Sequence, residues 1–159
     1  MAAGVVKDSL NINFAGLSGN AYTFGVADST APTISGYNPG LGATGVARTT
    51  NIVLTFNEFV KIGDGSITLT PSGGNGVDTP VVIHSSSGEV SISGTEVTIN
   101  PTELLMDRGG KTYTVTMETE AITDLEGNQF AGLAGTTYQF STVDATPPVI
   151  EVYLSLIHI

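Results

Sequence analysis

A stretch of 21 residues occurs twice in this 159-residue chain, once near each end. The segments FAGLSGNAYTFGVADSTAPTI (14–34) and FAGLAGTTYQFSTVDATPPVI (130–150) align without gaps at an offset of 116 residues. Eleven of the 21 positions are identical, and Asp8 pairs with Asp124 at the same offset. Since ordinary residue frequencies give roughly one or two identities by chance, a tandem repeat is the natural explanation.

The repeat predicts where the units of the chain begin and end. Residues 1–27 are expected to be the C-terminal remnant of a preceding repeat, residues 28–143 one complete unit, and residues 144–153 the start of the next. The joints ADSTAPT and VDATPPV contain proline, which fixes φ, so we expect them to be semi-rigid. Residues 154–159 (LSLIHI) are predicted to be a translated sequencing-adapter artefact; the alternative is a genuine first strand.

Alternation of apolar and polar residues recurs through the complete unit and indicates β-strands. It is seen in the segments 52–57, 67–70, 81–83, 90–92, 97–99, 112–117 and 138–141, and glycine-rich turns separate them. About seven to nine short strands at this spacing predict an all-β fold, a two-sheet antiparallel β-sandwich. Its inward residues would be aliphatic side chains together with four aromatic ones, Phe56, Tyr113, Tyr138 and Phe140.

An ordered series of short motifs resembles the SbsA-type bacterial Ig-like domain. The motifs are Pro32, the turn Gly42–Val46, the strand end Phe56–Val60, the strand Gly110–Val115, the loop Asp124–Asn128, and Tyr138 with Phe140. They cover nearly all of residues 30–143, with one departure at Phe59, where the family often has proline. The resemblance implies an Ig-like β-sandwich with a spacer or adhesive role in surface-layer proteins, adhesins or multidomain extracellular enzymes.

The charge balance excludes several kinds of partner. Five Lys and Arg stand against fifteen Asp and Glu, for a net charge of −10, so nothing can neutralise a run of phosphates. We therefore expect no nucleic-acid binding and no docking on anionic membranes. No apolar run is long enough to span a bilayer, so membrane insertion is not expected. The absence of cysteine excludes disulfides, thiolate zinc sites and a cysteine nucleophile.

Catalysis is not expected. His84 stands without an evident Ser or Asp partner in the sequence, and its expected place is the surface. Glu58 and Asp124 could form a carboxylate pair for glycoside chemistry, but the chain has no tryptophan to build a sugar-stacking groove. We therefore predict no catalytic residues and no certain cofactor.

Calcium binding is a more specific hypothesis for a functional site than catalysis is. In an Ig-like sandwich the first strand descends and the second returns, so Glu58 should come back beside Asp28 at the end where the chain enters. The loop DLEGN should lie there too. Asp28, Glu58, Asp124, Glu126 and Asn128 would then supply the oxygen ligands that calcium prefers. In the alternative, DLEGN is simply a turn in which Gly127 and Asn128 tolerate positive φ.

Two classes of function remain open. The leading one is a non-catalytic structural or adhesive repeat of an extracellular or cell-surface protein. Its partners would be neighbouring Ig-like repeats of the same chain, or cell-surface polysaccharide or protein. The alternative is a carbohydrate-binding or accessory module of an extracellular enzyme, for which Tyr37 and Tyr153 are the candidate aromatic platforms.

Overall fold

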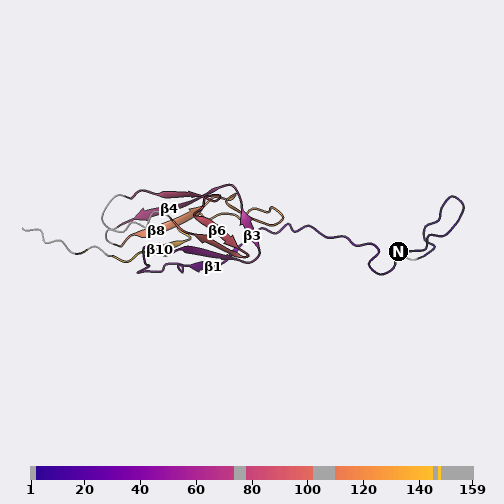
Figure 1. The fold of residues 1–159 in the computed structure, drawn as a ribbon, viewed down its shortest axis with the longest axis horizontal. Helices are drawn as coiled ribbons and strands as arrows, with labels where there is room; N and C mark the ends of the chain where they lie inside the picture. Colours follow the sequence, from indigo (N-terminus) through magenta and orange to yellow (C-terminus); the bar gives the residue numbers. More distant parts are fainter. Residues whose placement is uncertain (1–2, 74–77, 102–109, 145–146, 148–159) are drawn as a thin grey trace, which may run out of the picture.

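The alternating segments of the complete unit form two antiparallel sheets of four strands each (Figure 1). The computed structural model describes residues 3–73, 78–101, 110–144 and 147. The first sheet has the order β1 (Ile34–Asn38), β2 (Ile52–Phe56), β7 (Glu96–Ile99), β6 (Val90–Ser93). The second has the order β10 (Gln139–Ser141), β8 (Thr112–Met117), β4 (Ser66–Ser72), β5 (Val81–His84).

A short two-stranded ladder closes one end of the sandwich. It pairs β3 (Val60–Ile62) with β9 (Ile122–Asp124), so that Val60 lies opposite Asp124. The predicted all-β, antiparallel Ig-like sandwich is confirmed. The two sheets together hold eight strands, within the expected range, and the β3–β9 ladder adds two more.

The core lies between the sheets because each strand buries alternate residues. In β2, Ile52, Leu54 and Phe56 are 0–2% exposed, while Val53 and Thr55 between them are partly exposed. The same pattern in β8 buries Tyr113, Val115 and Met117 from the opposite sheet. All four aromatic residues expected in the core are buried there: Phe56, Tyr113, Tyr138 and Phe140.

Tyr138 fastens the last strand to the rest of the core. Its side chain is fully buried, its ring lies 4.9 Å from that of Tyr37, and its hydroxyl donates a 2.8 Å hydrogen bond to the Pro39 carbonyl. Burial, and secondarily the neighbouring Tyr37, raise the pKa of the Tyr138 phenol. The hydroxyl therefore stays protonated and keeps donating to Pro39.

The segment 42–46 runs along β10 in the parallel direction. Val46 bridges to Thr142, and four backbone hydrogen bonds join the two segments. The donors are Gly42, Ser141, Val46 and Val143, at 2.7–3.0 Å from their acceptors. Residues 42–46 thereby cover the edge of β10 that does not pair with β8.

Residues 3–27 lie outside the sandwich, and Figure 1 shows them running away from the end that carries β3. Residues 4–14 form a small hairpin in which Lys7 bridges to Asn13. The large apolar side chains of this segment are exposed: Val5, Val6, Leu10, Ile12, Phe14, Leu17, Tyr22, Phe24 and Val26. Except for Asp144 and Pro147, the expected start of a next repeat (144–153) and the expected artefact (154–159) lie outside the described residues.

The burial pattern predicts the effect of two matched truncations. Leu54→Ala empties part of the core and should lower the free energy of unfolding by about 2–5 kcal/mol. Val82 lies on the exposed face of β5 and is 64% exposed, so Val82→Ala should change the free energy of unfolding by less than about 0.5 kcal/mol. Urea denaturation of both variants measures the difference. Equal losses would contradict this placement of the core.

Candidate functional site

Three of the five predicted calcium ligands converge at the end of the sandwich where the chain enters. Asp28, Glu58 and Asp124 each place one carboxylate oxygen within 4.8 Å of the others. They come from the segment before β1, from the turn between β2 and β3, and from the end of β9. The β3–β9 ladder sets the juxtaposition, because Val60 pairs with Asp124 and Glu58 stands two residues earlier.

Asp124 is fully buried, and hydrogen bonds within its own loop satisfy its carboxylate. One oxygen accepts from the backbone N–H groups of Gly127 (2.6 Å) and Asn128 (2.7 Å). The other accepts from the Asn128 side-chain amide at 2.6 Å. Gly127 has φ = 100°, a conformation that favours glycine. The loop therefore has the hydrogen bonds of a stable turn as well as a place in the acidic cluster.

The hydrogen bonds decide the charge state of Asp124. Burial alone raises the pKa of this carboxyl. The hydrogen bonds from the Asn128 side chain and from the backbone of Asn128, Gly127 and Glu126 outweigh burial and hold the pKa below its ordinary value. Asp124 is therefore a carboxylate at neutral pH. Both the turn held by these hydrogen bonds and a cation site require this negative charge.

The predicted ligands Asn128, Asp28 and Glu126 differ in their contacts with the rest of the site. The Asn128 amide also donates to the backbone carbonyl of Asp28 at 3.1 Å, which ties the loop to the entering chain. Asp28 uses one carboxylate oxygen to accept from the Thr30 N–H at 2.8 Å. Glu126 is exposed and is not among the clustered carboxylates. The structure thus brings Asp28, Glu58 and Asp124 together, with Asn128 bonded to two of them, and leaves Glu126 outside.

This arrangement suits a hard cation better than covalent chemistry. Carboxylate oxygens are preferred calcium ligands, and negative charges this close repel unless solvent or a cation relieves them. Calcium takes six to eight oxygen ligands. The three clustered side chains could supply part of such a set, and backbone carbonyls or water would have to complete it.

His84 has partners that the sequence did not reveal. Its Nε2 lies 3.3 Å from an Asp64 carboxylate oxygen, and its Nδ1 lies 2.8 Å from the Ser86 hydroxyl. The Asp64 side chain is 92% exposed and that of His84 is 50% exposed, so water screens the group. It is a surface contact between the β3–β4 turn and the end of β5, and it lacks the buried carboxylate that orients a catalytic histidine.

Lys111 is a buried cation that no pattern in the sequence indicated. The residue is 3% exposed, and its ammonium donates to the Gly73 carbonyl at 3.0 Å and to the Asp78 carboxylate. These bonds fasten the end of β4 to the start of β8. Only the fold could show this role, because Asp78 lies 33 positions away and carries no motif.

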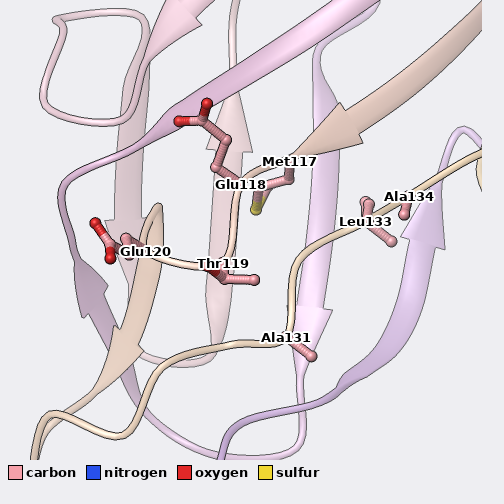
Figure 2. A pocket seen from close by; sticks show the side chains of 7 residues that line it. All are labelled: Met117, Glu118, Thr119, Glu120, Ala131, Leu133 and Ala134. Atoms are coloured by element: carbon pink, nitrogen blue, oxygen red, sulfur yellow. The ribbon is translucent and has the colours of Figure 1, made fainter.

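A hollow of about 540 Å³ lies beside the end of β8. It is lined by Met117, Glu118, Thr119, Glu120, Ala131, Leu133 and Ala134. Figure 2 shows the carboxylates of Glu118 and Glu120 pointing away from Leu133 and Ala134. The Glu118 carboxylate also accepts a 2.7 Å hydrogen bond from the Ser66 N–H. The two acids therefore do not converge on a common reacting atom in this hollow.

The comparisons with known proteins agree with the fold. Residues 28–142 match the family described as the bacterial Ig-like domain. No curated protein matches the chain. Among the described residues there is no helix with the length and hydropathy needed to cross a bilayer.

The lowered pKa of Asp124 predicts a pH dependence of stability. A carboxyl whose pKa is lowered by folding contributes stability above its unfolded-state pKa, and that contribution is lost as pH falls through the folded-state pKa. With EDTA present, the free energy of unfolding should fall as pH drops below about 4. In Asp124→Asn this fall should be smaller and the stability at pH 7 lower. Parallel pH profiles for the two proteins would contradict the assignment.

Proposed function

Because the chain belongs to the family of bacterial Ig-like domains, we propose that it is a non-catalytic structural or adhesive repeat of a multidomain extracellular or cell-surface protein. Domains of this family are generally non-catalytic modules and often occur in surface proteins. The proposal includes the SbsA-type, surface-layer character that the motif series implies. Neighbouring repeats of the same chain are its first partners, and surface polysaccharides or proteins are its targets if it is adhesive.

One observation supports the spacer role most strongly: the chain enters and leaves the unit at opposite ends. Asp28 at the start contacts Asn128, in the loop after β9. Asp144 at the finish lies beside Gly110, just before β8, and Thr142 donates to the Lys111 carbonyl. Since β8 runs from Thr112 to Met117, toward the entry end, a pull on the two ends acts along the long axis of the sandwich. Units joined this way extend head to tail.

The same geometry gives a mechanism for resisting extension. Force on the ends loads the parallel pair formed by 42–46 and β10, because one lies near the start of the unit and the other at its finish. The four hydrogen bonds between them lie across the pulling direction and share the load. Separation requires breaking them together, which makes the pair a mechanical clamp.

The carbohydrate-binding alternative receives less support. The Tyr37 ring is partly buried and packs against Tyr138, so it does not offer the exposed platform that stacking on a sugar needs. Tyr153 lies outside the described residues. Polysaccharide pull-down with the whole chain separates a spacer, which leaves the polysaccharide unbound, from a carbohydrate-binding module, which retains it.

The clamp can be tested by pulling single molecules from their ends. Val46→Pro removes one clamp N–H, and because Val46 also packs against the core, the free energy of unfolding should fall as well. For an equal loss in the free energy of unfolding, its unfolding force should drop more than that of Leu54→Ala, which leaves the clamp intact. If the unfolding forces instead follow the thermodynamic order, the clamp does not carry the load.

We further propose that calcium binds at the joint with the preceding unit, through Asp28, Glu58 and Asp124. Its support is the convergence of three carboxylates from three separate segments. A bound ion would stiffen the joint, because it would link the entering chain to both the β2–β3 turn and the DLEGN loop.

Calcium titration of the whole chain, followed by thermal melting, tests this second proposal. Calcium at about 100 times its dissociation constant should add about 2.7 kcal/mol to the stability and raise the melting temperature. Glu58→Gln should abolish the rise. Glu126→Gln, from the same loop but outside the cluster, should leave it unchanged. No rise in the wild type would mean that DLEGN is only a turn.

A further inference from the structure

Residues 4–26, here called the donor segment, have the hydrogen bonds of the segment that closes the sandwich. The bridge between Lys7 and Asn13 has its counterpart between Thr123 and Gln129, at the repeat offset of 116 residues. The bond from the Asp8 N–H to the Ile12 carbonyl corresponds to that from Asp124 to Asn128, and the bond from Phe14 to Val6 to that from Phe130 to Ile122. Asp8 also accepts from the Ile12 N–H, as Asp124 does from Asn128.

Unusual backbone angles recur at the same positions. Asn11 has φ = 67° where Gly127 has 100°. Gly16 has φ = 90° where Gly132 has 82°, and Gly19 has 57° where Gly135 has 60°. Among the described residues no sheet packs against the donor segment, yet it holds much of the closing conformation, so less conformational entropy remains to be lost on docking.

The two segments differ in what covers their apolar side chains. Phe130 and Leu133 are each 6% exposed, and Tyr138 and Phe140 are 0% and 1% exposed. The identical residues of the donor segment are open to water: Phe14 is 40%, Leu17 38%, Tyr22 72% and Phe24 79% exposed. Covering these four side chains is favourable in proportion to the apolar area removed from water.

The place that fits the donor segment is the surface that residues 120–142 cover in the sandwich, here called the closing slot. Three aromatic contacts define it: Phe130 packs edge-on against Phe56 at 5.2 Å, Tyr138 against Tyr37 at 4.9 Å, and Phe140 stacks on Tyr113 at 5.8 Å. The backbone of β8 pairs with β10 along the same surface. A strand that brings the same aromatic residues at the same spacing can make the same contacts.

We propose that the donor segment is a strand-exchange element that docks into the closing slot of a second copy of this chain, in the register given by the 116-residue offset. The proposal rests on the repeat organisation proposed above. Docking would place Tyr22 on Tyr37 and Phe24 on Tyr113 of the second copy, and pair residues 23–25 with β8. Two copies would then be joined head to tail, as successive units are in a tandem array.

The chain's own closing segment holds the slot in the wild type, for two reasons. It is covalently attached, so its effective concentration at the slot is high. It also fits better at two positions. Ala121 is fully buried, with its backbone nitrogen only 2.8 Å from where a Cβ on Gly65 would lie, and the donor has the larger Val5 there. Asn128, with its hydrogen bonds to Asp124 and Asp28, is replaced by Ile12. Exchange therefore requires the slot to be vacated.

Matched charge substitutions in the full chain test the proposal. Tyr138→Asp with Phe140→Asp places carboxylates in the core and disables the chain's own closing segment, while the donor segment is intact. This variant should form folded oligomers of at least twice the mass of one chain by sedimentation. Adding Tyr22→Asp and Phe24→Asp should return it to an unfolded monomer. Tyr22→Asp with Phe24→Asp alone should keep the wild-type mass and melting temperature, because both side chains are exposed.

The register is tested by improving the donor. In the variant with the disabled closing segment, Val5→Ala with Ile12→Asn should strengthen association by about tenfold or more, because it removes an overpacked methyl pair and restores an amide. A monomer from the disabled variant overturns the proposal, as do oligomers that persist without Tyr22 and Phe24, or an association that the improved donor leaves unchanged. The spacer proposal would survive any of these results, because it is tested on the closed wild-type sandwich.

Discussion

Closure of the sandwich by residues 120–142 is the constraint on which the rest of the structure depends. Phe130, Tyr138 and Phe140 bring three buried rings into the core from a segment with only two short strands of its own. Tyr138 adds a buried hydrogen bond to Pro39, so the last strand is tied to the loop after β1. The contacts that complete the core join residues far apart in the chain, and folds dominated by such contacts fold more slowly than folds built from local ones.

That closure also shapes both ends of the unit. At the exit end, β10 meets residues 42–46 in a parallel pair, which puts backbone hydrogen bonds across the long axis. At the entry end, β9 carries Asp124 into the ladder with β3 and so brings it to Glu58 and Asp28. The proposed mechanical clamp and the acidic cluster at the entry end thus both depend on one segment, and the repeated copy of it at residues 4–26 is the basis of the proposed strand exchange.

The stable turn around Asp124 and the proposed cation site need not compete. The hydrogen bonds around Asp124 give the loop a fixed shape, and the same bonds keep the carboxyl ionised. A fixed carboxylate needs little rearrangement to accept a cation, which lowers the entropic cost of binding. Asn128 connects this loop to the backbone of Asp28, so anything that orders the loop also orders the entering chain.

The sequence by itself determined the fold class, most of the core and the pole at which acidic residues gather. Alternation of apolar residues requires only that each strand bury one face, and this local rule holds for Ile52, Leu54 and Phe56 as for Tyr113 and Val115. Only the tertiary structure decided which side chains meet. It left Glu126 outside the cluster and placed the buried Lys111 against the partly exposed carboxylate of Asp78. It also gave His84 its partners Asp64 and Ser86. The physical reason is that strand register and loop conformation fix such contacts, and both depend on the pairing of segments far apart in the chain.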